Sequence, residues 1–141
     1  RAKGAEPIFM MTWAYKSNPL MLPEIEKMYK LLCEQVKADY IPGGPLFASS
    51  INYRPDLELF HDDIHPSPNG TYLLGLTFYK YFTGKSVNTI PTNISTLDTN
   101  GQILYLIFMN DLDANFLRQL VNEFQFKTLP LKTEQIISPK K

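Results

Sequence analysis

The chain has 141 residues, of which 44% are hydrophobic and 20% are charged, and its 14 basic and 14 acidic side chains give a formal net charge of zero. This hydrophobic content supports a globular core and is too high for a disordered chain. The balanced charge gives no bulk attraction to nucleic acid, and the longest apolar runs are far shorter than the roughly 20 residues of a membrane-spanning helix. We therefore expect neither a nucleic-acid partner nor a transmembrane segment.

The first predicted element is a strand over residues 7–13, a continuous apolar run that is typical of a parallel strand buried on both faces. The loop over residues 14–22 follows at the carboxyl end of this strand, where ligands collect in open α/β sheets. Trp13 and Tyr15 are therefore predicted to bind substrate, with plain core packing as the alternative for Trp13.

A helix is predicted over residues 23–38, because apolar side chains recur there at helical spacing. Cys33 lies on this apolar stripe and is interpreted as an inert buried thiol. Residues 40–42 form a short extended piece. Gly43-Gly44-Pro45 is predicted to turn the chain, and residues 46–55 to form a loop or a short helical segment.

Residues 57–84 carry the clearest pattern in the chain. A polar cluster, made of His61, Asp62, Asp63 and His65, precedes an apolar run that has helix signals at both ends. Ser67 suits the N-cap and Pro68 the first helical position, while Gly84 suits the left-handed residue just past the end; these signals predict a helix over residues 68–82.

The polar cluster lies on the loop before that helix. Asp62 and His65 are three residues apart, so a tight turn brings the carboxylate onto a ring nitrogen of the imidazole. Such a contact fixes which nitrogen keeps its proton, as a general base requires. Asp63 is expected to cap a turn or to lie in water, and His61 to be structural or to lie at the edge of a cleft.

The block Asp62-Asp63-Ile64-His65-Pro66, followed by Ser67, Gly70, Tyr72 and Leu73, resembles the last conserved block of the SGNH (GDSL-like) hydrolases. The resemblance covers about residues 5–86. It implies a parallel sheet in a three-layer α/β/α sandwich of the flavodoxin-like type, with residues 7–13 as a late core strand. It also implies that Asp62 is the orienting acid and His65 the base of a Ser-His-Asp triad, with no cofactor.

The chain departs from the family in lacking the Gly-Asp-Ser block that carries the nucleophile and the blocks that supply the oxyanion hole. Ser49, Ser50 and Ser67 are not in a Gly-x-Ser-x-Gly elbow and are rejected as nucleophiles. Residues 1–86 are therefore interpreted as the C-terminal part of a hydrolase domain, whose partner is the missing N-terminal part of the same protein. The substrate is a small-molecule or carbohydrate ester, or one with an acyl chain.

Residues 87–141 are interpreted as a C-terminal extension. Residues 85–102 are rich in Thr, Asn, Ser and Pro and are predicted to be a long surface connection. Residues 103–109 fit a strand or a buried helical turn. Asn110 or Asp111 is predicted to cap an amphipathic helix that docks on the sheet or meets a partner, and residues 127–141 to be a loosely held tail.

Two other classes of function remain open. The histidines and aspartates of the polar cluster are all possible ligands of a divalent metal ion, although four ligands within five residues crowd one another. The half-fold would alternatively be a binding or structural module without catalysis, which the absence of a nucleophile favours.

Overall fold

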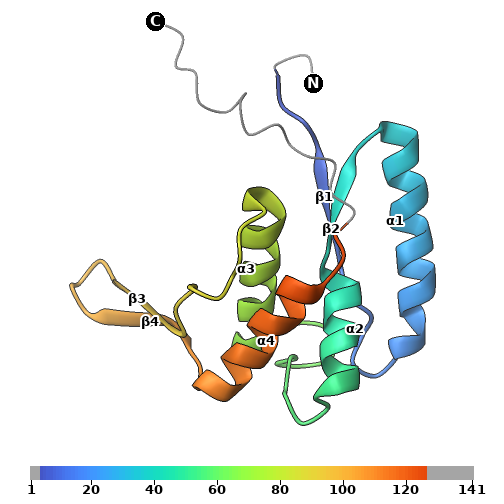
Figure 1. Ribbon diagram of the computed structural model, residues 1–141. Coiled ribbons are helices and arrows are strands. Elements are labelled where there is room, and N and C mark those ends of the chain that lie inside the picture. The colour runs from blue at the N-terminus through green and yellow to red at the C-terminus, as the bar shows by residue number, and fades with distance from the viewer. Residues whose placement is uncertain (1–3, 127–141) are drawn as a thin grey trace, which may run out of the picture.

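The computed structural model describes residues 4–126, and these form a mixed α/β fold. Within this range there are four α-helices and two separate two-stranded sheets (Figure 1). No described helix has the length and apolar character needed to span a membrane. The elements in chain order are β1 (Ile8–Met11), a 3₁₀ turn at Pro19–Met21, α1 (Leu22–Val36), β2 (Asp39–Pro42), α2 (Gly43–Tyr53), α3 (Pro68–Thr83), β3 (Asn93–Leu97), β4 (Ile103–Phe108) and α4 (Asp111–Glu123).

The first sheet is parallel, as the sequence predicts. Its register pairs Ile8 with Asp39 and Met11 with Pro42, and α1 and α3 lie on opposite sides of it (Figure 1). Among the described residues β1 pairs only with β2, so its other edge carries unpaired backbone groups. The described chain thus has helices on both sides of a two-stranded parallel sheet, without a complete three-layer sandwich.

Helix α1 has the predicted position, but its apolar stripe is only partly covered. Cys33 is buried, and burial raises the pKa of its thiol, in line with the interpretation as an inert thiol. Met28, by contrast, is 56% exposed. The apolar stripe identified in the sequence is therefore buried at only some of its positions, because the small sheet covers only part of the helix.

The predicted turn at Gly43-Gly44-Pro45 is wrong, since α2 begins at Gly43. The glycines here permit close approach to β1. A Cβ on Gly43 would lie 2.8 Å from the Met11 carbonyl oxygen, and one on Gly44 would lie 2.3 Å from that of Thr12. The sequence predicts a turn here because glycines are typical of turns, whereas the requirement for a residue without a side chain comes from a strand that is distant in sequence.

Both predicted ends of α3 are confirmed. The hydroxyl of Ser67 accepts a hydrogen bond from the Gly70 N–H at 3.2 Å, and Gly84 closes the helix with φ at 65°. Leu73 and Leu76 on this helix are fully buried. This helix thus fixes the position of the polar loop that leads into it.

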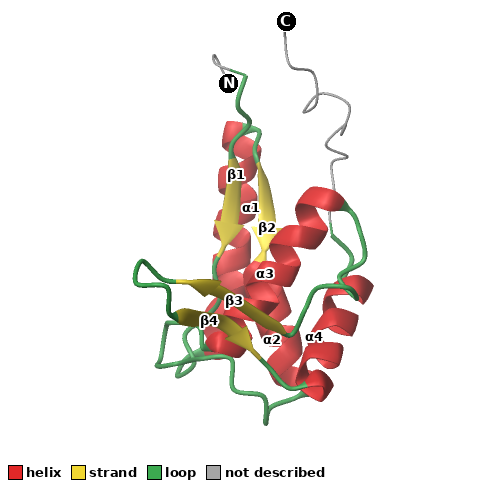
Figure 2. Cartoon of the chain, turned by 90° about the vertical axis from the view of Figure 1, so that its left-hand side faces the viewer, coloured by secondary structure: helices red, strands yellow, loops and turns green. Residues whose placement is uncertain are grey.

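The C-terminal region differs from the predictions in two ways. Residues 85–102 contain β3, which pairs with β4 in an antiparallel hairpin rather than serving only as a surface connection (Figure 2). Helix α4, capped by Asn110, packs against α2 and α3 and not on the parallel sheet. The predicted tail at residues 127–141 lies outside the described residues.

One hydrophobic core includes side chains from both sides of the predicted boundary after residue 86. Residues 46–76 contribute Leu46, Phe47 and Leu73, and the C-terminal region contributes Val87 and Leu117. The C-terminal region therefore covers the same apolar interior as the loop and helix that carry the predicted site.

Candidate active site

The loop that carries His61, Asp62 and His65 is closed at its base by backbone hydrogen bonds. The N–H of His61 donates to the carbonyl of His65 at 2.8 Å, and the N–H of Ser67 donates to the carbonyl of Leu59 at 2.8 Å. These bonds bring the chain before and after the loop together in a short antiparallel bridge. The loop therefore has a defined shape although its side chains lie in solvent.

Asp62 and His65 are in direct contact, as the sequence predicts. Oδ2 of Asp62 lies 2.7 Å from Nδ1 of His65, and Oδ1 accepts the N–H groups of Ile64 and His65 at 2.8 and 2.7 Å. An ionised carboxylate is only an acceptor, so Nδ1 carries the proton and Nε2 of the neutral ring keeps its lone pair. This is the tautomer that a general base uses.

The same three contacts favour the ionised form of Asp62. The His65 backbone N–H, followed by the His65 ring and the Ile64 N–H, holds the pKa of this carboxyl well below its usual range. The carboxylate thus stays charged beside the ring over the neutral pH range.

The outer side of the ring is open to solvent. The His65 side chain is 68% exposed, and Nε2 has no hydrogen-bond partner among residues 4–126. His61 is also exposed. A group that approached from outside the described residues would thus reach Nε2 without displacing another side chain.

Asp63 does not pair with His65 but binds the loop after β1. Its Oδ1 accepts the Ser17 N–H at 2.7 Å and its Oδ2 accepts the Ser17 hydroxyl at 2.9 Å, while its carbonyl accepts the Lys16 N–H at 2.9 Å. The expectation of a turn cap or a solvated group missed this tertiary contact, because nothing in the local sequence indicates which distant loop lies opposite.

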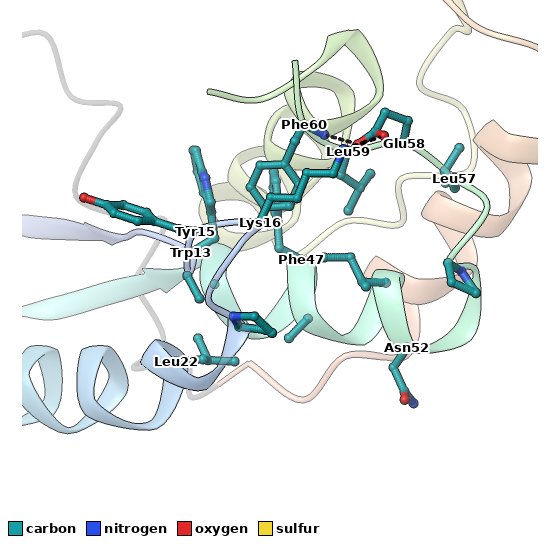
Figure 3. Close-up of a pocket in the computed structure, with 16 residues that line it drawn as sticks. Trp13, Tyr15, Lys16, Leu22, Phe47, Asn52, Leu57, Glu58, Leu59 and Phe60 are labelled. Atoms are coloured by element: carbon teal, nitrogen blue, oxygen red, sulfur yellow. Dashed lines mark hydrogen bonds and ion pairs between the residues drawn. The ribbon is translucent and has the colours of Figure 1, made fainter. Parts of the chain in front are cut away.

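Trp13 connects the polar loop to a cavity. Its indole Nε1–H donates to the Ile64 carbonyl at 2.9 Å, and its ring stacks on Phe47 at a centroid distance of 4.5 Å. Trp13 and Tyr15 both line a cavity of about 330 Å³ between the loop after β1, helix α2 and residues 55–60 (Figure 3). The two predicted substrate-binding residues thus share one cavity, while Trp13 also makes the core contact given as its alternative.

His65 is not among the residues that line this cavity. It lies next to the cavity wall, because Phe60 in that wall bridges to Pro66 and Trp13 binds the carbonyl of Ile64. The structure therefore places the Asp62–His65 pair and the aromatic cavity beside one another, joined through two short hydrogen-bonded connections.

An ion pair lies within the cavity lining. Nζ of Lys16 is 2.8 Å from Oε2 of Glu58, and Oε1 of Glu58 accepts the Phe60 N–H at 3.1 Å. The Lys16 contact holds the pKa of Glu58 below its usual range. No local pattern in the sequence indicates this pair, since its members are 42 residues apart.

Two of the three serines rejected as nucleophiles are a helix cap and a buried residue. Ser67 caps α3 and also donates its hydroxyl to the Glu58 carbonyl at 2.8 Å, and Ser50 is fully buried in α2. Across residues 4–126, no three His, Cys, Asp or Glu side chains are grouped closely enough to hold a metal ion. Of the ligand set considered above, Asp62 and Asp63 are directed to different partners.

No family model, curated protein or solved structure matches the chain.

Proposed function

We propose that the chain is the C-terminal portion of an SGNH-type serine esterase, in which His65 is the general base and Asp62 orients it. The observation that supports this most is the 2.7 Å bond from Nδ1 to the Asp62 carboxylate, with Nε2 left open to solvent. The His-Asp pair of a Ser-His-Asp triad needs both features, because the histidine ring must keep one proton on Nδ1 and accept another on Nε2.

In this proposal the serine comes from a segment outside these 141 residues. Its hydroxyl proton passes to Nε2 of His65 while its oxygen attacks the ester carbonyl. The imidazolium, stabilised by Asp62, then protonates the departing alcohol, and a water activated by the same ring releases the acid. The substrate is a small-molecule or carbohydrate ester, and no cofactor takes part.

The finer fold follows from the same proposal. The open edge of β1 would pair with further strands of a parallel sheet, which would complete a three-layer α/β/α sandwich of the flavodoxin-like type. Two observations support it: β1 has one unpaired edge within the described residues, and α1 exposes Met28, Leu31 and Leu32 at 56%, 44% and 39%. The N-terminal part of the same protein would cover both.

The test uses the gene product extended upstream of Arg1 and measures p-nitrophenyl acetate hydrolysis together with labelling by a fluorophosphonate that traps reactive serines. His65→Ala should lower kcat/KM by several orders of magnitude, up to about 10⁶-fold, and Asp62→Asn by about 10⁴-fold. Both variants should lose labelling, because the serine is no longer activated.

The matched control is His61→Ala, which removes the other histidine of the same loop and should keep full activity. The 141-residue chain alone should hydrolyse the ester no faster than its own His65→Ala variant. Serine-type turnover by this chain alone, or an extended protein whose activity survives His65→Ala, would refute the proposal.

One observation favours a second candidate, a binding or structural module without catalysis. The His65 ring is 68% exposed and does not line the cavity beside it. In such a module Asp62 and His65 only shape the loop. The same experiment decides, since an extended protein with neither labelling nor hydrolysis supports this candidate.

A further inference from the structure

The cavity beside the candidate site is strongly aromatic. Phe47 is in its wall, with Trp13 stacked on it at 4.5 Å and an interplanar angle of 10°, and with Phe60 against it edge-on at 5.6 Å. Leu57 and Leu59 in the same wall are also buried. Apolar side chains therefore form most of the surface that a ligand would touch (Figure 3).

The polar groups of the lining offer little to a hydroxyl-rich ligand. Lys16 and Glu58 pair with each other, and the Trp13 N–H is bonded to Ile64. The side chains of Asn52 and Tyr15 point away from the other labelled lining residues (Figure 3). A sugar that entered would lose hydrogen bonds to water without replacing them, and leaving its hydroxyls buried and unpaired is unfavourable.

The size of the cavity limits its occupant. Ligand cavities span roughly 300–1,000 Å³, and this one, at about 330 Å³, is at the small end of that range. A ring or a short branched chain fits such a volume, whereas a long acyl chain or an oligosaccharide does not.

We infer that this cavity binds a small aromatic or branched aliphatic acyl group, the apolar part of the ester that His65 helps to cleave. The assignment to an acyl group rests on the proposed function, while the binding of an apolar group rests on the cavity alone. The connection through Phe60 to Pro66 and through Trp13 to Ile64 places a bound group beside the loop that carries His65.

The chain offers a direct readout, because Trp13 is its only tryptophan. Benzamide, an uncleavable analogue of a benzoyl ester, should change the indole fluorescence saturably, with a Kd of about millimolar order for so small a ligand. Isobutyramide should compete with benzamide, and methyl glucoside should not.

Ala48→Leu tests the location, because Ala48 lines the cavity and the added carbons fill it. Benzamide affinity should fall by about tenfold or more, equivalent to about 1.4 kcal/mol. Ala38→Leu is the matched control, since Ala38 is also partly buried but lies outside the lining, and this variant should bind as the unmodified chain does.

Ile51→Glu gives a second route if Ala48→Leu does not fold. Ile51 lines the cavity but is 40% exposed. A carboxylate there disfavours an apolar ligand but remains in contact with water, so it does not destabilise the folded state. Absence of benzamide binding, preference for methyl glucoside, or equal binding by all variants would overturn the inference. If the protein binds benzamide but shows no esterase activity, the inference that the cavity binds an apolar group stands and only the proposed function is refuted.

Discussion

The loop at residues 61–67 and the β3–β4 hairpin differ in how firmly they are attached to the rest of the fold. The loop is attached more firmly than its polar sequence suggests, and the hairpin less firmly than its strands suggest. The loop is polar and has no regular secondary structure, yet it is held by Asp62, by Asp63 and by the Trp13 indole. The hairpin is regular secondary structure and its second strand is apolar, yet Tyr105 is 60% exposed and Phe108 76%. Attachment to the rest of the fold, rather than local regularity or hydrophobicity, distinguishes the two regions.

The difference has a physical cause in how each region is anchored. The loop enters α3 directly, and the first turn of that helix packs under it against Leu59 and Pro66. The hairpin reaches the core mainly at its base, where Ile107 is buried and Ile94 packs against the core cluster. A two-stranded hairpin is only marginally stable alone, so its exposed end adds little to the free energy of unfolding.

The largest expected effect comes from truncating the core beneath the loop. Leu73 in α3 is fully buried, so Leu73→Ala should lower the free energy of unfolding by about 2–5 kcal/mol through lost burial and the cavity left behind. Phe108→Ala in the hairpin should change it by less than about 0.5 kcal/mol. Urea unfolding of both variants measures this, and similar losses would mean that the hairpin is as firmly attached as the loop.

A smaller effect tests how tightly the loop sits on α3. In Gly70→Ala the new Cβ would lie 2.3 Å from the Leu59 carbonyl oxygen and 3.0 Å from Cβ of Pro66, so the loop must shift. We expect a loss of about 1–3 kcal/mol.

The matched control is Gly75→Ala in the same helix, where a Cβ would have no neighbour within 4 Å. This change should stabilise the helix by up to about 1 kcal/mol, because alanine has the higher helix propensity. Thermal unfolding of the two variants gives the comparison. The prediction requires that their changes in the free energy of unfolding have opposite signs.

The smallest expected effect is on the acid dependence of stability. The pKa of Asp62 is held below its usual range by the His65 N–H, the His65 ring and the Ile64 N–H, so the folded state prefers the carboxylate. This contribution is complete above the ordinary aspartate pKa and is lost as the pH falls below it towards the lowered pKa. Urea midpoints between about pH 5 and pH 3 should therefore fall less steeply in Asp62→Asn. Parallel profiles for the two proteins would show that the contact contributes nothing.

Local sequence signals predicted the elements whose causes are local. Ser67 and Gly84 marked the ends of α3 because capping involves only neighbouring backbone groups. The contact of Asp62 with His65 followed from a three-residue spacing. For α4 the sequence predicts a cap at Asn110 or Asp111, and the structure shows that it is Asn110, whose side chain accepts the Asp113 N–H.

Contacts between distant segments could not be read in this way. The local sequence predicts a turn at Gly43 and Gly44, because the strand they pack against lies some thirty residues earlier in the chain and leaves no local signal. The pairing of β3 with β4 was missed because residues 85–102 have the composition of a loop, and a strand of only five residues gives a weak local signal.

What the sequence determined by itself is therefore the capped helix and the Asp62–His65 pair that precedes it, because both depend on backbone and side-chain groups within a few residues. The tertiary structure alone decided that Asp63 binds Ser17, that Lys16 pairs with Glu58 and that Trp13, Phe47 and Phe60 enclose one cavity. The contacts of Asp63 with Ser17, of Lys16 with Glu58 and of Trp13 with Phe47 join residues more than 30 positions apart, and only the packing of the helices and the parallel sheet brings them together.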